Sequence, residues 1–352
     1  MKEIVESDIL KALSHVDDPD LHKDLVTLGM IKNIVIDNGH VSFDVELTTP
    51  ACPMKDMIRN ACVNAVQHLV DKSLTVTPNM TSKVTTSRTE EKVLPGVRNI
   101  IAIASGKGGV GKSTVAVNLA RALVATGAKV GLMDADIYGP SIPTMMGLKG
   151  QRPGAEDHKM VPLEKDGIKV ISIGFLVDDN QAIVWRGPMA SSAIRQFVSD
   201  VRWGDLDYLV LDLPPGTGDI HLTIAQSIPL SGAIMVTTPQ DVALADCKKA
   251  LGMFNSAGIN IPVLGVIENM SWFTPNDNPD KKYYLFGKGG GQKLADEFSI
   301  PLLGQIPLVE QIMHAADNGI AVLDNAVVHD AYEALAGEVA RFIAIRNSVP
   351  VG

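Results

Sequence analysis

The chain has 352 residues and a formal net charge of −9, with 46% hydrophobic and 20% charged residues. This composition is that of a globular protein long enough for two domains. The acidic balance argues against broad nucleic-acid or membrane binding, and we predict neither partner. With only Cys52, Cys62 and Cys247, and no apolar signal-peptide run or stretch of about 18 apolar residues, we predict a cytoplasmic protein without disulfides or membrane spans.

Residues 1–76 predict a small α/β domain. Its expected elements are a helix over 3–14, hairpin strands over 30–36 and 40–47, a helix from Pro53 to Val70 and a strand over 74–77. The proline is expected at the first position of its helix. The next stretch, 77–97, is rich in Thr, Ser, Lys and Glu, and predicts a linker.

Residues 98–352 alternate short apolar runs with helical stretches. The apolar runs fall at 100–104, 129–133, 169–173, 208–211, 233–237, 263–267 and 302–306. Strands that alternate with helices and are apolar at their centres imply a parallel sheet covered on both faces. We therefore predict an α/β fold with a doubly wound, mostly parallel sheet, preceded by the small α/β domain. Ligands of such sheets bind at the carboxyl ends of the strands.

A phosphate-binding loop is the most specific motif of the chain. Residues 106–113 read GKGGVGKS and fit G-x-x-x-x-G-K-[ST], between an apolar run and a helix expected over 114–126. Lys112 is expected to reach the β- and γ-phosphates and Ser113 to ligate Mg²⁺, so we predict a P-loop ATPase. A chance glycine-rich turn is the alternative. The residues predicted to bind ATP here are Gly106, Lys107, Gly108, Gly109, Val110, Gly111, Lys112, Ser113 and Thr114.

Three aspartates follow apolar runs at the expected carboxyl edge of the sheet. Asp134 and Asp136 come after 130–133, and Asp212 ends 208–211. Asp212 resembles a Walker B aspartate, which implies that it holds Mg²⁺ through water. Asp134 is expected to support Mg²⁺ or the loop, and Asp136 to orient or activate the attacking water. Helix capping is the alternative role for strand-end aspartates.

The lysine directly after the first glycine, in KGGVGKST, resembles the deviant Walker A loop of the ParA/MinD-type ATPases. That resemblance implies a face-to-face homodimer in which Lys107 reaches the neighbour's nucleotide, as an arginine finger would. A solvated loop lysine is the alternative. Asn269 follows the run 263–268, where related ATPases read the adenine ring; a turn-forming asparagine is the alternative.

Longer segments resemble the Mrp/ApbC family of P-loop ATPases, which carry or insert iron–sulfur clusters. They are 185–197, 203–219, 236–246, 265–273 and 283–291, while 18–31 and 48–58 resemble the small PaaD/SufT-like domain often fused ahead of these ATPases. The resemblance implies ATP, Mg²⁺ and a [4Fe–4S] cluster, and apo client proteins or an assembly scaffold as partners. It also makes 214–219 a switch loop that responds to the γ-phosphate and 138–143 the matching first switch.

One departure from the family concerns cluster ligation. The family usually has a C-x-x-C pair through which two protomers bind one bridging [4Fe–4S] cluster, but residues 272–282 contain no cysteine here. Asn, Asp and Thr are poor substitutes for thiolates. Two hypotheses therefore stay open: a cluster carrier or assembly factor, and an ATP-controlled dimeric switch that docks a client or scaffold without a cluster. Positioning on DNA or membrane, as in ParA-like proteins, is a weaker third.

Cys52 is the one cysteine in a functional setting. It lies directly before the helix expected from Pro53, where backbone N–H groups and the helix dipole would lower the pKa of its thiol. We predict it as a tentative iron–sulfur ligand, with a structural cysteine as the alternative. Cys62 and Cys247 have the spacing of core positions.

Overall fold

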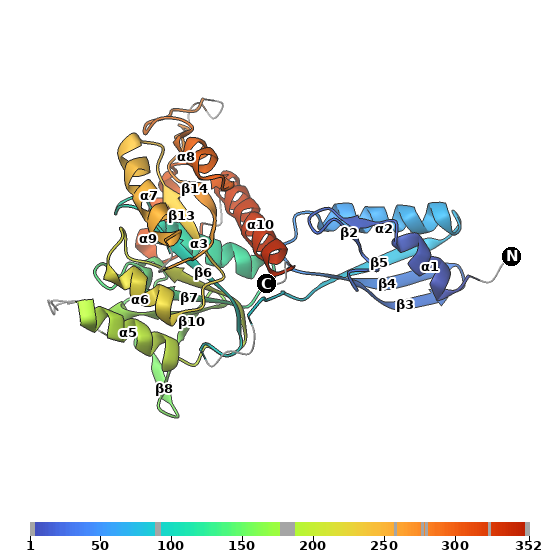
Figure 1. Ribbon diagram of the computed structural model, residues 1–352, viewed down its shortest axis with the longest axis horizontal. Helices are drawn as coiled ribbons and strands as arrows, with labels where there is room; N and C mark the ends of the chain where they lie inside the picture. The colour runs from blue at the N-terminus through green and yellow to red at the C-terminus, as the bar shows by residue number, and fades with distance from the viewer. Residues whose placement is uncertain are drawn as a thin grey trace. The chain divides into compact units, whose positions relative to one another are not determined.

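The computed structural model describes residues 4–88, 93–176, 187–256, 259–275, 278, 281–322 and 325–348. These residues form two compact units, which Figure 1 traces along the chain. The first unit holds the described residues up to Ser87 together with the end of the last helix from Ala340, and the second runs from Arg88 to Val339. Among the described helices, none combines the length and apolar character needed to cross a bilayer.

The first unit is a three-stranded sheet packed against two helices. Its elements are α1 (Glu6–Leu13), β1 (Asp17–Asp18), β2 (Lys23–Asp24), β3 (Ile31–Asp37), β4 (His40–Leu47), α2 (Lys55–Leu69) and β5 (Thr75–Ser82). The strand order is β3-β4-β5, with β3 antiparallel and β5 parallel to β4. Ile9, Phe43 and Ile58 meet in one buried core from α1, β4 and α2. The predicted hairpin of two strands is therefore present.

Two details of the first unit differ from the sequence predictions. Residues 77–82 are not linker but strand, because they pair with β4 as far as Leu47 and Ser82. A polar edge strand needs few apolar side chains: Val76 and Met80 reach the core, and the proline of this strand is tolerated at the edge. Helix α2 begins at Lys55, two residues after Pro53, because a turn from Cys52 to Lys55 comes first. Residues 89–92 of the predicted linker lie outside the described residues.

The second unit is built on an eight-stranded sheet in the order β10-β11-β7-β12-β6-β13-β14-β15. All neighbours are parallel except β10 and β11, so the predicted doubly wound, mostly parallel sheet is confirmed. Its strands are β6 (Val97–Ala104), β7 (Val130–Asp134), β10 (Leu163–Lys165), β11 (Ile168–Ser172), β12 (Leu206–Asp212), β13 (Gly232–Thr237), β14 (Val263–Glu268) and β15 (Leu302–Gln305). A two-stranded hairpin, β8 (Gly154–Glu156) and β9 (Lys159–Val161), stands apart.

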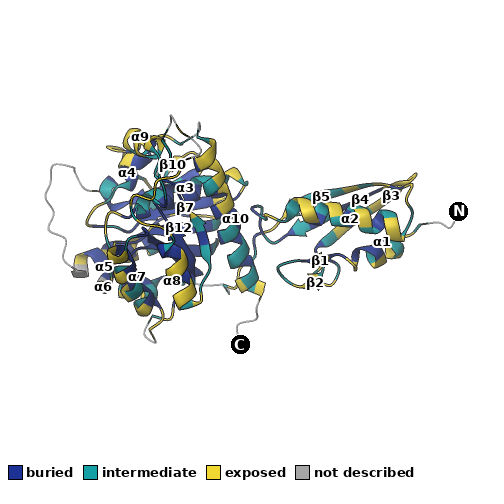
Figure 2. Cartoon of the chain, turned by 90° about the horizontal axis from the view of Figure 1, so that it is seen from above, coloured by how far each residue is buried: buried dark blue, intermediate teal, exposed yellow. Residues whose placement is uncertain are grey.

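Helices cover the sheet on both faces. They are α3 (Lys112–Ala125), α4 (Ile142–Met145), α5 (Gly187–Ser199), α6 (Asp219–Ser227), α7 (Asp241–Phe254), α8 (Gly290–Phe298), α9 (Glu310–Asn318) and α10 (Ala326–Ser348). Ile100 and Ile101 of β6 are both fully buried although successive strand residues point to opposite faces. Figure 2 shows this buried centre under the more exposed helices. The strand ends and the loops after them are thus the part of the sheet left open to ligands.

Candidate nucleotide site

The strand order brings the predicted carboxylates together. Because β12 lies between β7 and β6, Asp212 pairs in register with Asp134 on one side and with Ile103 on the other. The phosphate loop leaves β6 directly after Ala104, so it starts beside Asp212. A parallel sheet aligns the carboxyl ends of its strands, and three loops far apart in sequence therefore meet at one edge.

Steric constraints require glycine at two positions of the phosphate loop, Gly106 and Gly111. Gly111 caps α3 with φ of 82°, in the left-handed region that favours glycine. A Cβ at this position would lie 2.2 Å from Nδ2 of Asn269. Gly106 has its own constraint, since a Cβ there would lie 2.2 Å from the backbone carbon of Asp246. At Gly106 the loop therefore lies against α7, and at Gly111 against Asn269, with no room for a side chain at either position. The loop backbone then turns into the amino end of α3.

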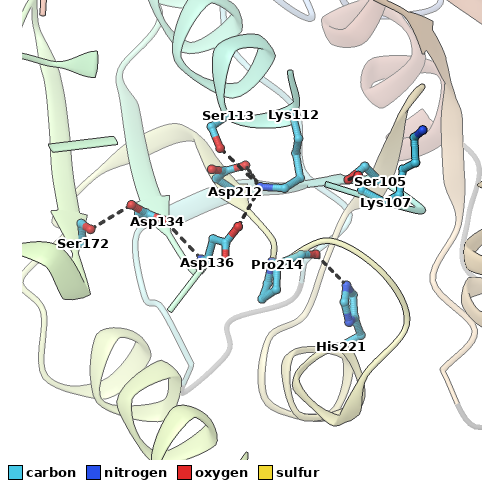
Figure 3. A network of polar contacts seen from close by, with 10 residues as sticks. All are labelled: Ser105, Lys107, Lys112, Ser113, Asp134, Asp136, Ser172, Asp212, Pro214 and His221. Atoms are coloured by element: carbon cyan, nitrogen blue, oxygen red, sulfur yellow. Dashed lines mark hydrogen bonds and ion pairs between the residues drawn. The ribbon is translucent and has the colours of Figure 1, made fainter. Parts of the chain in front are cut away.

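Lys112 is buried among the carboxylates (Figure 3). Its Nζ lies 2.6 Å from Oδ1 of Asp212 and 3.7 Å from Oδ2 of Asp136. The same ammonium donates to Oγ of Ser113 at 3.4 Å. One cation, two carboxylates and one hydroxyl thus converge at the amino end of α3, where backbone N–H groups and the helix dipole favour anions.

Asp134 lies behind this cluster and is fully buried. Its Oδ2 accepts a hydrogen bond from Oγ of Ser172 at 2.9 Å, and its Oδ1 accepts one from the backbone N–H of Asp136 at 3.2 Å. Oδ1 therefore orders the loop after β7, and Oδ2 ties the end of β7 to the end of β11. Of the two roles predicted for Asp134, this geometry favours support of the loop over direct contact with a metal ion.

The cluster holds more negative than positive charge. Burial, and then the charge of Asp212, raise the pKa of Asp134 well above its usual range. Burial also raises the pKa of Asp136 and of Asp212, although the Lys112 ammonium opposes both shifts. Within the described residues, Oδ1 of Asp136 and Oδ2 of Asp212 are buried without a hydrogen-bond partner. Carboxylate and hydroxyl oxygens suit Mg²⁺, so Ser113, Asp136 and Asp212 fit a divalent cation.

A cleft of about 560 Å³ opens over the phosphate loop. Its lining includes Lys107, Lys112, Ser113, Thr114 and Asp136. The lining residues that sequence reasoning did not assign to the nucleotide are Ser105, Thr144, Met145, Ala316 and Asp317, whereas Pro215 comes from the predicted switch loop. Ala316 and Asp317 belong to α9, more than 200 residues after the loop, and their sequence carries no signal of this role. Pro140 and Ser141 line the same cleft, from the segment predicted as a first switch.

Lys107 and Asn269 take different positions around the loop. The Lys107 ammonium points away from the Lys112–Asp212 pair, although the residue lines the cleft (Figure 3). Asn269 is buried, and its side-chain amide donates to the carbonyl of Val110 at 2.8 Å. It therefore fixes the phosphate loop directly. Contact of Asn269 with an adenine ring, and of Lys107 with a neighbour's nucleotide, stay predictions.

Two segments of the chain match families of known proteins. Residues 96–343, more than half of the chain, match the family described as the NUBPL iron-transfer P-loop NTPase. The chain belongs to this family. Ahead of the NUBPL-type NTPase domain, residues 6–77 match a second family, described as an iron–sulfur cluster assembly protein. Together the two matches confirm the resemblance to cluster-carrier ATPases with a small fused domain.

Three named relatives are similar to this NUBPL-type NTPase over most of its length. The iron–sulfur cluster carrier protein of Synechocystis sp. is 49% identical over 325 residues, which cover 90% of each chain. That of Deinococcus radiodurans is 45% identical and covers 96% of each chain. The chloroplastic Fe-S cluster assembly factor HCF101 of Arabidopsis thaliana is 44% identical and covers 89% of this chain and 59% of the relative.

Two solved structures share the fold of the NUBPL-type domain. A nucleotide-binding protein from Archaeoglobus fulgidus, solved in complex with ADP, has a TM-score of 0.57 and 39% identity, covering 64% of this chain and 87% of that one. Apo McdA from Cyanothece has a TM-score of 0.51 and 19% identity, covering 68% and 98%, and shows a likeness of fold alone. The predicted fold class is thereby confirmed.

The cysteines of this NUBPL-type NTPase do not form a cluster of thiols in the described residues. Cys62 and Cys247 are buried in separate cores, as predicted, and burial raises the pKa of each thiol to about 12. Cys52 is half-buried, and burial followed by the Asp18 and Asp20 charges raises the pKa of its thiol, against a hydrogen bond from the Met54 backbone. The predicted lowering of this pKa is wrong, because desolvation of the thiol outweighs the hydrogen bond from the backbone.

Proposed function

We propose that this NUBPL-type NTPase binds MgATP in the cleft over the phosphate loop and hydrolyses it to ADP and phosphate. One observation carries the proposal: buried Lys112 lies between Asp212 and Asp136, at the amino end of α3, beside two carboxylate oxygens without hydrogen-bond partners. A triphosphate needs backbone N–H groups, a lysine and a divalent cation held by oxygens. The cluster offers the N–H groups, the lysine and oxygen ligands for the cation in one place.

Each residue then has a separate task in the proposed hydrolysis. Backbone N–H groups of the loop bind the phosphates, and Lys112 exchanges its contact with Asp212 for the β- and γ-phosphates. Ser113 and Asp212 would hold Mg²⁺, which neutralises phosphate charge when bound. Asp136 lines the cleft, where a carboxylate oxygen can accept a hydrogen bond from the attacking water. Phosphoryl transfer depends chiefly on such positioning and charge neutralisation, so no covalent catalyst is required.

We also propose a homodimer as the hydrolysing species. Lys107 lines the cleft but directs its ammonium away from the Lys112–Asp212 pair (Figure 3), which supports a role toward a second copy. A positive charge delivered from a neighbour would stabilise the transferring phosphoryl group as an arginine finger does. We further propose that this dimer acts in the cytoplasm, the location predicted from the low cysteine content.

The cargo of the dimer, we propose, is an iron–sulfur cluster that it delivers to apo client proteins. Support comes from the match of residues 6–77 to an iron–sulfur cluster assembly family and from relatives named as cluster carriers. Cys52, in the first unit, is the most exposed thiol among the three cysteines. The cluster would then be held by a ligand set other than the usual C-x-x-C pair, with Cys52 as one thiolate donor.

A specific observation favours a second candidate function. Residues 272–282 contain no cysteine, so the usual bridging site lacks its thiolates; Asn276, Asp277, Pro279 and Asp280 of this stretch lie outside the described residues. A protein without that site could act as an ATP-controlled dimeric switch that docks a client or an assembly scaffold. The ATP site would be the same in both cases, and only the cargo would differ.

Anaerobic reconstitution with iron and sulfide separates the two candidates. Iron and labile sulfide are counted per protomer in wild type, Cys52→Ser and Cys247→Ala, the last being a control for the loss of a buried thiol. Uptake by wild type and by Cys247→Ala that is lost in Cys52→Ser supports the carrier with Cys52 as ligand. Absence of uptake in wild type, with MgATP hydrolysis intact, contradicts the carrier and leaves the switch.

A further inference from the structure

His221 lies directly behind the loop that follows Asp212. It belongs to the first turn of α6, its side chain is buried, and its ring meets Phe254 of α7 edge-on with centroids 6.4 Å apart. Nε2 of His221 lies 3.1 Å from the carbonyl oxygen of Pro214, a contact drawn in Figure 3, and Nδ1 lies 3.2 Å from that of Gly218. The imidazole thus bridges the two ends of the loop 214–218.

The two carbonyls bear on which ring nitrogen of His221 carries the hydrogen. A carbonyl oxygen only accepts hydrogen bonds, and a neutral imidazole has a single N–H to donate. The Gly218 oxygen already accepts the backbone N–H of His221 at 3.0 Å. Burial lowers the pKa of His221 and favours the neutral ring. The tautomer that fits is therefore the one with hydrogen on Nε2, whose hydrogen bond to Pro214 ties the start of the loop to α6.

The loop held by His221 reaches the phosphate loop in two places. Pro215 lines the nucleotide cleft, and its Cγ would lie 3.9 Å from a Cβ on Gly108. The backbone N–H of Gly216 donates to the carbonyl of Ser105 at 2.9 Å, and the Ser105 hydroxyl donates to the carbonyl of Lys107 at 3.0 Å. A chain of contacts therefore runs from His221 through the loop to the residue predicted to act on a neighbour's nucleotide.

We propose that His221 is a positioning residue for ATP hydrolysis, which holds the loop 214–218 against the phosphate loop through the hydrogen bond from Nε2 to Pro214. This inference rests on the proposed ATPase function. His221 does not touch the nucleotide cleft; it acts through Pro215, Gly216 and Ser105. A hydrogen bond from a side chain can be released while α6 stays folded, so the contact suits a loop that rearranges when the γ-phosphate is lost.

Three substitutions of His221 separate the hydrogen bond from the volume of the ring. The amide nitrogen of His221→Gln reaches the place of Nε2, that of His221→Asn reaches the place of Nδ1, and His221→Leu has no donor. With MgATP we expect His221→Gln to keep kcat within about threefold of wild type. His221→Asn and His221→Leu should lose about 100-fold in kcat, since small misplacements near a reacting centre cost rates of that order. KM for ATP and the affinity for ADP should change little.

A second measurement follows the loop without requiring hydrolysis. Hydrogen exchange of a peptide covering 216–218 should be slow in wild type and His221→Gln and faster in His221→Asn and His221→Leu, at equal unfolding temperatures. Wild type that fails to hydrolyse ATP overturns the proposed ATPase, and the exchange rates then decide the loop role alone. Wild-type kcat and exchange in His221→Leu, or an equal loss in all three variants, overturns the positioning role.

Discussion

Nζ of Lys112 lies 2.6 Å from Oδ1 of Asp212, and the two side chains are only 7% and 0% exposed. Both partners of this buried ion pair have predicted tasks with MgATP, the lysine toward phosphates and the aspartate toward the cation. Phosphate oxygens would compete with Asp212 for Lys112, and a cation would compete with Lys112 for Asp212. Binding of MgATP is therefore an exchange of partners within a preformed cluster, which keeps these groups oriented before the ligand arrives.

Lys107→Ala tests the homodimer. The Lys107 ammonium is directed away from the catalytic cluster, so its removal should leave the affinity for ATP within about twofold of wild type. Turnover should fall by about 10³-fold or more, as expected for a charge supplied from a neighbour. The measurement is specific turnover against protein concentration, which should rise with concentration for wild type. Turnover per protomer that is constant down to high dilution would contradict catalysis by a dimer.

Asp134→Asn should change how stability depends on pH. Burial holds the folded-state pKa of Asp134 above the value in the unfolded chain. The stability linked to its bound proton is therefore present at low pH and is lost as pH rises through the raised pKa. An asparagine remains neutral and can still accept the Asp136 N–H, so ligand-free Asp134→Asn should unfold at a higher temperature than wild type at pH 8.

The difference between Asp134→Asn and wild type should shrink as the pH falls toward the ordinary carboxyl range, about 4. Thermal unfolding at several pH values measures it, with Asp241→Asn at an exposed position as the control. A variant that follows the wild-type curve at every pH would mean that burial does not hold a proton on Asp134.

Gly106→Ala should destabilise the second unit. The added Cβ would lie 2.2 Å from the backbone carbon of Asp246 in α7, and backbone atoms of a packed helix cannot move aside cheaply. Overpacking of this kind costs about 1–3 kcal/mol, which is several degrees in unfolding temperature for a domain of this size. Gly108→Ala is the matched control, because its nearest new neighbour is 3.9 Å away. Equal unfolding temperatures of the two variants would contradict the close approach of loop and helix.

Much of the site could be predicted from local sequence. The phosphate loop carries its own signature, and the aspartates after β7 and β12 could be paired because parallel strands align their ends. The distances place Lys112 beside Asp136 and Asp212 at that edge, while the tasks of the three residues stay predictions. Strands with apolar centres, such as β6 and β13, likewise signal a sheet buried on both faces.

Other features depend on contacts that no local pattern contains. Asp317 reaches the cleft only because α9 packs beside α4, and Ser172 reaches Asp134 only because β11 pairs with β7 in register. Strand β5 was predicted only as far as Thr77, because most of its later side chains are polar; the hydrogen bonds with β4 keep residues 78–82 in the sheet. The pKa of Cys52 was predicted in the wrong direction, because desolvation outweighs the backbone hydrogen bond at that position.

The most direct test of the account is Mg²⁺-dependent binding and hydrolysis of ATP by wild type and Lys112→Ala, measured by calorimetry and phosphate release. Wild type should bind ATP more tightly with Mg²⁺ and release phosphate, whereas Lys112→Ala should lose measurable turnover. Removing one partner of a buried ion pair costs about 3–5 kcal/mol, so circular dichroism must first show that the variant is folded at the assay temperature. Wild-type turnover in folded Lys112→Ala would contradict the assignment of the site.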